Sequence, residues 1–429
     1  MLDFGNSEHP GVQAQLNRLS ALSIQRDTLN LDAISKLLDR LGNPHKLLPP
    51  VFHVAGTNGK GSTCAFLRAI LEAQGLRVHV TTSPHLVRYN ERFRVAGELI
   101  GDDRLAELLE EVFDAAEGLD CSFFEITIAA AFTEFARVPA DACVVEVGLG
   151  GRLDATNVLE QPAVCGIAAL GLDHERFLLA PEAGTPDEPM ARIAFEKVGI
   201  VKRGVPLIAL RSGKLEREII REQADKASAP FFVCGEEWNV ASEAKTLLYS
   251  DGNGALRLPI PQLHGQHQSY NAALAVAMIR HQTSIHVDAT AIETGMRNVS
   301  WPARLQKLTN GPLTGTRECW LDGGHNRNAG EMLGMHFSGQ KVHLLIGMIE
   351  GKDPKSLIEP MHAVLESITA VPVTGRPSHN ASAFGSNARD AKDLPTALAG
   401  LPDDGLPTLI GGSLYLAGEA LKLNEEMPS

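Results

Sequence analysis

Residues 53–63, His-Val-Ala-Gly-Thr-Asn-Gly-Lys-Gly-Ser-Thr, constrain the fold of this chain more than any other stretch. They follow an apolar pair and precede a segment with the apolar spacing of a helix, which predicts a strand, a glycine-rich loop and a helix. Glycines let successive backbone N–H groups surround an anion at the positive end of that helix. The glycines are Gly56, Gly59 and Gly61, the added cation is Lys60, and Ser62 or Thr63 supplies a hydroxyl for a magnesium ion. The stretch predicts a phosphate-binding loop.

This loop differs from the common GxxxxGK[ST] pattern. The spacing from Gly56 to Lys60 is one residue shorter, and Gly61 separates the lysine from the hydroxyl. A glycine-rich turn that binds nothing would give the same short match. The rest of the chain must therefore decide between the two interpretations.

Composition predicts a globular enzyme of two domains. The chain has 429 residues, of which 44% are hydrophobic and 21% charged, with a mean hydropathy of −0.05. Its formal net charge is −13 and it has no long basic run, which argues against a nucleic-acid partner. An anionic substrate would need a local cationic pocket.

Cysteine usage and the lack of long apolar runs suggest a reduced compartment. The first ten residues include two acids and no apolar signal segment, and no run of eighteen apolar residues occurs. We therefore expect a cytoplasmic protein with no membrane partner. The six cysteines lack CxxC pairing and are predicted to be reduced core residues: Cys64, Cys121, Cys143, Cys165, Cys234 and Cys319.

From residue 51 onward, strand-like and helix-like segments alternate, which predicts an α/β protein. Residues 142–147 are continuous and β-branched, as in a central parallel strand, and they include Glu146. A carboxylate at the carboxyl end of a buried strand beside a phosphate loop is where a magnesium-organising acid belongs. Residues 163–170 bring Asp173 and His174 to the same edge. The alternatives are a solvent-facing glutamate and a histidine in an ordinary polar contact.

Two further segments define the organisation. Residues 251–254, Asp-Gly-Asn-Gly, predict an antiparallel hairpin. Residues 301–304, Trp-Pro-Ala-Arg, interrupt the alternation, and a second strand and helix alternation follows them. This predicts a hinge and a smaller α/β domain of about 125 residues.

Together these motifs resemble a known family, the folylpolyglutamate synthases. That family includes the dihydrofolate synthases and belongs to the Mur ligase superfamily. The resemblance covers roughly residues 28–420 and depends on the set of motifs rather than on any one of them. The motifs are residues 53–63, 83–86, 90–92, 146–157, 173–174, 196–200, 267–268, 271–272 and 322–326.

The resemblance implies a fold and a domain organisation. Residues 1–300 would form an ATP-binding domain like the central domain of Mur ligases, with a P-loop-type, mostly parallel sheet flanked by helices. Residues 301–429 would form a smaller C-terminal α/β, Rossmann-like domain that binds glutamate. Catalysis would then require the two domains to close.

The resemblance also implies an activity. The enzyme would be an ATP-dependent amide ligase that adds L-glutamate to reduced folates, and to dihydropteroate in bifunctional members, through an acyl phosphate. The implied partners are ATP, L-glutamate and the pterin substrate, and we expect a monomer. A monofunctional folylpolyglutamate synthase is the alternative. A Mur peptide ligase fits less well, because residues 1–50 leave no room for a UDP-sugar-binding domain.

Two classes that do not ligate fit the residues poorly. A nucleotide-switch protein would need an Asn-Lys-x-Asp segment to read the base, and the chain has none. A dinucleotide-binding dehydrogenase has no need for Lys60.

The resemblance assigns roles to residues of this chain. Two magnesium sites are implied, with Lys197 carbamylated, because a carbamate can bind a cation and an ammonium cannot; a plain lysine paired with a phosphate is the alternative. The implied catalytic residues are Lys60, Lys197 and His325, and the metal ligands are Ser83, Glu146, His174 and Lys197. The nucleotide-binding residues are Gly56, Thr57, Asn58, Gly59, Lys60, Gly61, Ser62, Asn271, Arg304 and Asp322. The substrate-binding residues are Leu29, Asn30, Ser122, Phe123, Phe124, Glu125, Leu153, Asp154 and Ala155.

Some of these roles have simpler alternatives. Phe124 can stack on a flat heterocycle, but an aromatic pair at a helix start also packs in cores. Arg304 could be a surface charge at the hinge. Three arginines, Arg88, Arg92 and Arg94, could bind the carboxylates of a glutamate tail.

The chain departs from the family pattern at three places. Arg327 replaces a usual proline, Val198 replaces a common alanine, and residues 178–190 insert a loop before the Glu-Lys motif. The insertion bears on the geometry of the second metal site.

Overall fold

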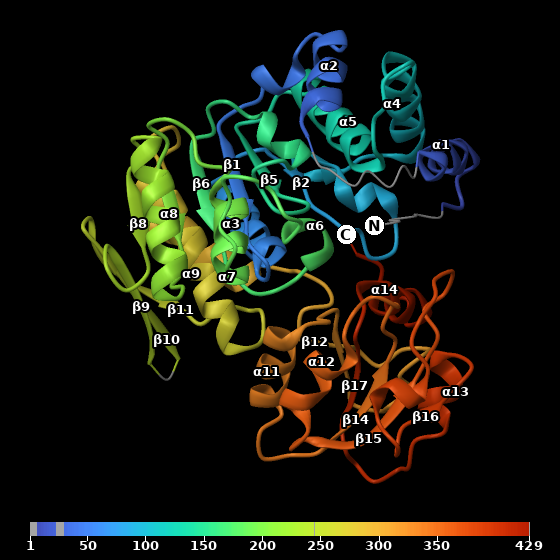
Figure 1. The fold of residues 1–429 in the computed structure, drawn as a ribbon. Helices are drawn as coiled ribbons and strands as arrows, with labels where there is room; N and C mark the ends of the chain where they lie inside the picture. The colour runs from blue at the N-terminus through green and yellow to red at the C-terminus, as the bar shows by residue number, and fades with distance from the viewer. Residues whose placement is uncertain (1–6, 23–29, 244, 429) are drawn as a thin grey trace. The chain divides into compact units, whose positions relative to one another are not determined.

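The computed structural model describes residues 7–22, 30–243 and 245–428, and the chain divides into two compact units (Figure 1). Unit 1 comprises Met1–Gln262 and Gln268–Ser300, and unit 2 comprises Leu263–His267 and Trp301–Ser429. Residues 263–267 thus group with unit 2, whereas the predicted boundary between the domains follows residue 300. The His264 ring packs edge-on against Trp320 at 5.3 Å, which accounts for their grouping with unit 2.

A mostly parallel sheet forms the centre of unit 1. In the described part of this unit, eight strands lie in the order β4-β3-β2-β5-β1-β6-β7-β8, and only the β3 and β4 edge pairs antiparallel. The central strands β1 and β5 are buried along their whole length, as their apolar sequences require. The strands are β1 (Val51–Ala55), β2 (Val78–Thr81), β3 (Arg94–Val95), β4 (Glu98–Leu99), β5 (Ala142–Glu146), β6 (Val164–Ile167), β7 (Leu207–Ala209) and β8 (Phe231–Val233).

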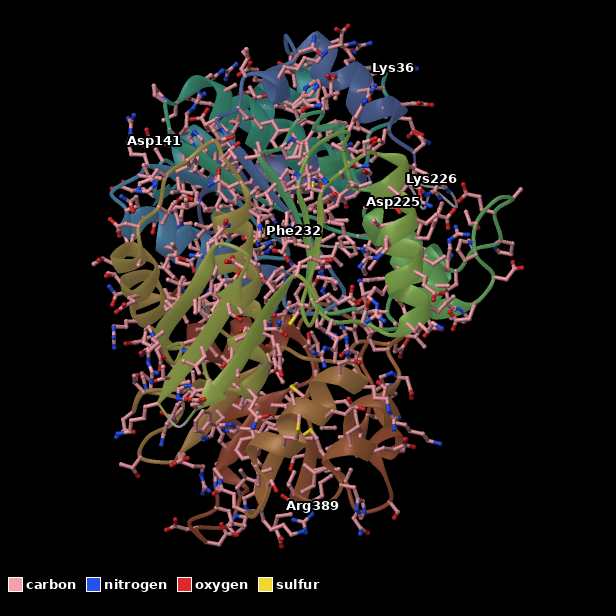
Figure 2. All side chains as sticks on the ribbon, turned by 90° about the vertical axis from the view of Figure 1, so that its left-hand side faces the viewer. Lys36, Asp141, Asp225, Lys226, Phe232 and Arg389 are labelled. Atoms are coloured by element: carbon pink, nitrogen blue, oxygen red, sulfur yellow. The ribbon has the colours of Figure 1, made fainter. Side chains whose placement is uncertain are left out.

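Helices flank this sheet. They are α1 (Pro10–Ala21), α2 (Asp32–Arg40), α3 (Lys60–Ala73), α4 (Asp102–Ala115), α5 (Phe123–Arg137), α6 (Glu175–Leu178), α7 (Pro189–Val198), α8 (Lys214–Lys226), α9 (Gln266–His281) and α10 (Ala289–Asn298). Short 3-10 turns lie at Pro44–Lys46, Tyr89–Arg92 and Ala155–Val158. In Figure 2, Asp225 and Lys226 mark the C-terminal end of α8.

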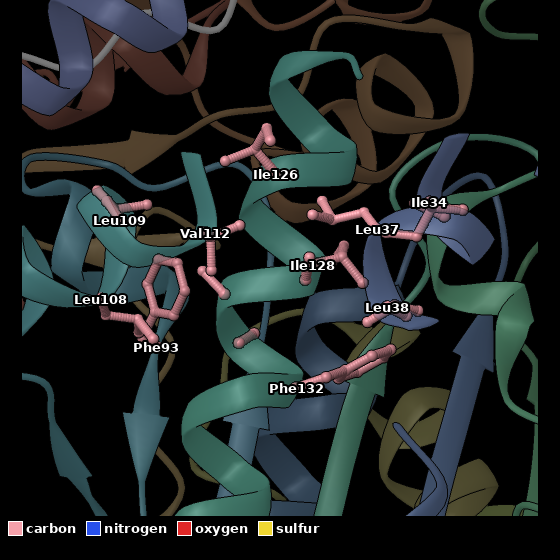
Figure 3. Close-up of a cluster of buried hydrophobic side chains, with 14 of the residues drawn as sticks. Ile34, Leu37, Leu38, Phe93, Leu108, Leu109, Val112, Ile126, Ile128 and Phe132 are labelled. Atoms are coloured by element: carbon pink, nitrogen blue, oxygen red, sulfur yellow. The ribbon is translucent and has the colours of Figure 1, made fainter. Parts of the chain in front are cut away.

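One hydrophobic core of unit 1 surrounds α5. Figure 3 shows Ile126, Ile128 and Phe132 of α5 between apolar side chains of α4 and α2. The neighbours from α4 include Leu108, Leu109 and Val112, and those from α2 include Ile34, Leu37 and Leu38. All six cysteines are buried and free, as predicted.

A small antiparallel sheet, β11-β10-β9, lies apart from the main one. The strands β9 (Trp238–Glu243), β10 (Thr246–Asp251) and β11 (Gly254–Pro259) include the predicted hairpin at residues 251–254. Arg280 of α9 donates two hydrogen bonds of 2.7 Å to Asp251. Phe232, labelled in Figure 2, stacks on His281 with ring centroids 3.9 Å apart. The Arg280 contact fixes the hairpin to the end of α9, and the Phe232 stacking packs β8 against the same end.

Unit 2 is the smaller α/β unit that the sequence predicts. Within its described residues, six strands lie in the order β12-β13-β17-β14-β15-β16, parallel except for β12. The strands are β12 (Gln306–Lys307), β13 (Cys319–Asp322), β14 (Val342–Ile346), β15 (Leu365–Ala370), β16 (Arg389–Asp390) and β17 (Thr408–Gly411). The helices are α11 (Arg327–His336), α12 (Pro354–Met361), α13 (Leu394–Ala399) and α14 (Leu414–Leu423), with a 3-10 turn at Ala381–Phe384. Across the described residues of both units, none of the helices combines the length and apolarity needed to span a membrane.

Candidate active site

The phosphate loop connects β1 to α3, as predicted, and the residues that directly follow β6 pack against it. The backbone N–H groups of Thr57 and Asn58 donate to the carbonyl oxygen of Ala169, at 2.8 and 3.1 Å. Gly56 lies so close to Ala168 that a β-carbon would come within 2.8 Å of its side chain. Because Thr57 and Asn58 direct their N–H groups to Ala169, the backbone donors that could bind an anion here are those of the first turn of α3, which a helix leaves unpaired.

Two lysines converge on this loop. The Nζ atoms of Lys60 and Lys197 each donate to the carbonyl oxygen of Gly56 at 3.0 Å. Burial, followed by the nearby charge of Lys60, lowers the pKa of Lys197 to about 7, and the carboxylates of Asp173, Asp154 and Glu196 oppose this shift. The structure thus brings together two residues that lie far apart in the sequence.

Asn271 of α9 lies against the same loop. Gly59 adopts a φ of +83°, and a β-carbon there would overlap the Asn271 side chain. Asn271 is buried and donates to Gln268 Oε1 at 3.0 Å. Asn271 therefore lies at the phosphate loop, beside the other residues of unit 1 that we predicted to bind nucleotide.

Ser83 and Glu146 lie at the ends of neighbouring strands. The Ser83 N–H donates to Glu146 Oε2 at 3.1 Å. Glu146 is only 5% exposed and pairs in register with Val54, just before the phosphate loop. Burial, followed by the charge of Glu146, raises the pKa of Cys64 on α3. A carboxylate and a serine hydroxyl are hard oxygen donors of the kind that fits Mg²⁺.

His174 follows β6 at the same edge. It has a left-handed backbone, with a φ of +54°, and begins the short helix α6. Its Nε2 atom lies 3.9 Å from Asp173 Oδ2, and Asp173 is one of the carboxylates that act on the pKa of Lys197. Our sequence reasoning gave Asp173 no role of its own. Over residues 7–22, 30–243 and 245–428, no three His, Cys, Asp or Glu side chains gather as a ready-made metal site.

Two predicted substrate residues stabilise a helix. Ser122 Oγ accepts from the N–H of Glu125 at 3.3 Å, and the Glu125 carboxylate accepts from the N–H of Ser122 at 2.8 Å. This reciprocal pair is a capping box for α5. The Ser-x-x-Glu spacing was the signal that could have revealed it. The two side chains therefore use their polar atoms to begin α5.

The aromatic pair that follows has two different surroundings. Phe123 packs edge-on against Tyr89, with ring centroids 5.9 Å apart. The Phe124 ring lies directly over Gly148, where a β-carbon would overlap it. Gly148 belongs to the loop after Glu146, so Phe124 and this loop are packed together.

Asp154 is a buried junction in that loop. Its carboxylate accepts from the N–H of Leu149 at 2.8 Å and from the N–H of Thr156 at 3.0 Å. Leu153 is half-buried and Ala155 is buried beside it. Asn30 is exposed, and its side chain accepts from the N–H of Asp32 at 3.0 Å. Leu29 lies outside the described residues.

The three arginines have internal partners. Arg92 is fully buried, and its Nε donates to His85 Nδ1 at 2.9 Å, so the expectation that it binds a glutamate tail is wrong. Arg88 pairs with Asp102 at 2.8 Å. Arg94 donates to the carbonyl of Gly97 at 2.7 Å.

Glu182 of the inserted loop completes a ring of four charged side chains beside α7. Arg152 pairs with Glu196 at 3.0 Å, and Arg192 pairs with the same carboxylate at 3.0 Å. Glu182 of the insertion contacts both arginines. Because Glu196 precedes Lys197 on α7, the ring fixes the helix that carries that lysine. The insertion therefore leaves Lys197 at the phosphate loop.

Unit 2 gathers its predicted residues in one loop cluster. Asp322 at the end of β13 accepts from the N–H of Leu305 at 2.9 Å and from that of Gly324 at 2.7 Å. Arg304 is flanked by two left-handed residues and donates to the Ala303 carbonyl at 3.0 Å. His325 Nδ1 lies 3.3 Å from the Gly323 carbonyl oxygen.

Two more residues of unit 2 bear on this cluster. Sequence reasoning assigned no role to His267, whose pKa burial lowers, while Asp322 and Arg304 act on it with opposite signs. In the sequence, only the His267-Gln268 motif indicated that His267 could belong to the site. Arg327 is the first residue of α11, a position where proline is common, and it pairs with Glu331 at 3.5 Å.

Comparison with known proteins gives consistent results, although no family model matches the chain. The dihydrofolate synthetase of Saccharomyces cerevisiae is 30% identical over 435 residues, which cover 92% of this chain and 98% of that protein. The dihydrofolate synthase/folylpolyglutamate synthase of Bacillus subtilis is 31% identical over 366 residues, 79% of this chain and 80% of that protein.

Solved structures agree with this over nearly the whole chain. E. coli FolC in complex with DHPP and ADP superposes with a TM-score of 0.85 at 29% identity, covering 96% of this chain and 97% of that one. A bifunctional folylpolyglutamate synthase/dihydrofolate synthase with Mn, AMPPNP and L-glutamate bound gives 0.83 at 27% identity, covering 98% and 99%. These findings confirm the predicted fold class. The chain belongs to the folylpolyglutamate synthase/dihydrofolate synthase family.

Proposed function

We propose that this ligase adds L-glutamate to dihydropteroate and to reduced folates, using ATP. The observation that carries the proposal is the convergence of Lys60 and Lys197 on the Gly56 carbonyl, at the carboxyl edge of a parallel sheet that also carries Glu146. This arrangement offers the Lys60 cation, first-turn N–H groups and a carboxylate to a triphosphate and its metal. The names of the relatives supply the acceptor class.

The reaction requires an activated carboxylate. A carboxylate is a poor electrophile because its leaving group would be oxide. Transfer of the γ-phosphoryl group from ATP to a pterin carboxylate releases ADP and gives an acyl phosphate. The neutral amine of glutamate then attacks the acyl carbon, the amide C–N bond forms, the C–O bond to phosphate breaks, and the nitrogen loses a proton. Lys60 and the first turn of α3 position and neutralise the phosphates, which is most of what phosphoryl transfer requires.

We propose that two divalent metals serve this site. Ser83 and Glu146 would hold the first ion, because the two residues are in hydrogen-bond contact and a hydroxyl and a carboxylate are hard oxygen ligands that fit Mg²⁺. His174 and Lys197 would hold the second, with Lys197 as a carbamate. A bound Mg²⁺ supplies charge neutralisation for the triphosphate. The low pKa of Lys197, about 7, favours the neutral amine that carbamylation needs.

The remaining assignments stay as predicted. We propose that unit 1 binds ATP through Gly56, Lys60, Ser62 and the residues between them, together with Asn271. Unit 2 would bind glutamate, and its residues Arg304, Asp322 and His325 would contact the nucleotide.

The pterin would contact Phe124 and the segment 153–155. These two parts are linked, because Phe124 packs on Gly148 and the next residue, Leu149, donates to the Asp154 carboxylate. Because polar atoms of Ser122 and Glu125 are used in the capping box, their part in pterin binding would be to place Phe124. The enzyme would act as a monomer.

The test is an assay of ADP release with Mg²⁺ and L-glutamate. The acceptors, supplied in turn, are dihydropteroate, tetrahydrofolate and a UDP-muramoyl compound. We expect activity with both pterins and none with the third. Activity with tetrahydrofolate alone would reduce the proposal to a monofunctional synthase, and activity with the muramoyl compound alone would refute it. Arg304→Ala should lower turnover strongly while the denaturation midpoint stays close to that of the wild type.

A further inference from the structure

His53 is a polar residue in a strand that is buried along its whole length. It lies in β1 between apolar neighbours and is fully buried. Burial lowers its pKa to about 3, so its imidazole is neutral under all working conditions. A neutral ring that is fully buried neither contacts a substrate nor neutralises its charge. A functional role for His53 must therefore come from a fixed hydrogen bond.

That hydrogen bond begins a chain of three side chains. His53 Nε2 lies 2.9 Å from Thr156 Oγ1, and Thr156 Oγ1 lies 2.6 Å from Asp154 Oδ1. A carboxylate only accepts, so the Thr156 hydroxyl donates its single proton to Asp154. The threonine oxygen must then accept from His53, which places the imidazole proton on Nε2. The direction of both hydrogen bonds is thus determined: His53 donates to Thr156, and Thr156 donates to Asp154.

The chain ends at the segments assigned above to the pterin. Asp154 accepts from the N–H of Leu149 at 2.8 Å, and it begins the turn Ala155–Val158 by accepting from the N–H of Thr156 at 3.0 Å. Leu149 follows Gly148, on which the Phe124 ring lies. A single carboxylate therefore holds both the loop under Phe124 and the segment 153–155.

We propose that His53, acting through Thr156, is a positioning residue for the pterin acceptor. This inference rests on the proposed function. The relay, which comprises His53, Thr156 and Asp154, holds the Asp154 carboxylate in one orientation. In that orientation the carboxylate positions both residues 153–155 and the Gly148 loop. The phosphate loop has its own anchor, the N–H groups of Thr57 and Asn58 on the Ala169 carbonyl, so we expect the relay to have little effect on nucleotide binding.

The inference predicts a selective kinetic effect. Thr156→Val keeps the shape of the side chain but removes the hydroxyl, which leaves the His53 N–H without its partner and Asp154 Oδ1 with only the backbone N–H of residue 156. The KM for dihydropteroate should rise about tenfold, the size expected for a lost buried hydrogen bond. The KM for ATP should stay within about twofold. Thr156→Ser retains the hydroxyl and should restore the pterin KM.

A second pair of variants tests the other end of the relay. His53→Leu removes the donor, whereas His53→Gln can place an amide N–H near the position of Nε2. We expect a raised pterin KM in the first and a smaller change in the second. Thr133→Val is the matched control, because Thr133 is also buried in unit 1 but its hydroxyl donates to Ala129 of its own helix at 2.7 Å. That variant should leave both KM values unchanged.

Three results would overturn the inference. The first is an unchanged pterin KM in Thr156→Val, and the second is an equal rise in the KM values for ATP and pterin. If Thr156→Val does not fold, a pterin KM for His53→Leu equal to that of wild type would be the third. A wild-type enzyme that is inactive with every pterin would instead refute the proposed function itself, and this inference with it.

Discussion

Gly59 offers a sharp test of how the phosphate loop is built. Its φ of +83° is one that alanine adopts at a cost of about 1–2 kcal/mol. A β-carbon at Gly59 would also overlap the Asn271 amide, whose Cγ would lie 3.0 Å away. Moving Asn271 breaks its hydrogen bond to Gln268, which costs about 1 kcal/mol more. Gly59→Ala should therefore lose about 2–3 kcal/mol of unfolding free energy.

Gly75 provides the matched control. Its φ of +85° is nearly the same, and no atom lies within 4 Å of the position that a β-carbon would take. Gly75→Ala should show the backbone cost alone, about 1–2 kcal/mol. The difference between the two variants isolates the collision with Asn271.

Urea denaturation and initial rates of ADP release measure the two effects. If Asn271 contacts the nucleotide, its displacement should raise the KM for ATP about fivefold in Gly59→Ala, since 1 kcal/mol corresponds to about a factor of five. Gly75→Ala should retain the wild-type KM. Equal denaturation midpoints and equal KM values in the two variants would refute the close approach of Asn271 to the loop.

Other residues give further predictions. The pKa of Lys197 is about 7 in the folded protein and 10.5 in the unfolded chain, so between these pH values the unfolded chain binds more protons. Burying Lys197 therefore lowers the free energy of unfolding most below pH 7, and this cost shrinks as the pH rises. Lys197→Met should therefore gain stability relative to wild type at pH 6 and lose that gain by pH 9.5, as urea denaturation would show; a constant difference would contradict the assigned pKa. Glu196→Gln should cost about 3 kcal/mol because it removes the buried carboxylate that pairs with Arg152 and with the buried Arg192, whereas Glu182→Gln, at an exposed site, should cost under about 1 kcal/mol in the same assay. Ser122→Ala should lose about 1 kcal/mol through its cap, and a pterin KM raised more than twofold would indicate direct substrate contact instead.

Strongly patterned elements could be predicted from the sequence. Apolar runs at residues 319–322 and 342–346 predict two strands, and β13 and β14 have these bounds, while β5 ends one residue before the end of the predicted strand 142–147. The pattern also predicts a strand at residues 368–373, whereas β15 lies at Leu365–Ala370. Val371 and Val373 are buried although they follow the strand, so their apolarity reports burial and not strand geometry. Periodicity alone cannot separate the two.

The start of α4 shows another limit. The sequence places Asp102 or Asp103 at the cap, but the cap residue is Gly101, with no side-chain hydrogen bond. Asp102 instead accepts from Arg88 and Asn90, both more than ten residues away. A local rule for helix caps competes with tertiary partners, and here the tertiary partners win.

The candidate site was predictable where topology alone decides it. Parallel strands end at one edge of the sheet, so Ser83, Glu146 and His174 had to lie near the phosphate loop once β2, β5 and β6 were recognised. The partners of each side chain were not predictable in the same way. Arg92 could be taken for a substrate ligand because nothing local shows that it is buried against His85.

Protonation is the property furthest from the sequence. The Glu-Lys motif locates Lys197, but its low pKa arises from burial and from Lys60, which lies on a different helix. With a pKa of about 7, roughly half of the Lys197 amines are neutral at pH 7, whereas with the ordinary value of 10.5 fewer than about 0.1% would be. Carbon dioxide adds only to a neutral amine. A carbamate at this position therefore depends on the fold that buries the lysine, and the motif without that fold would give an ammonium.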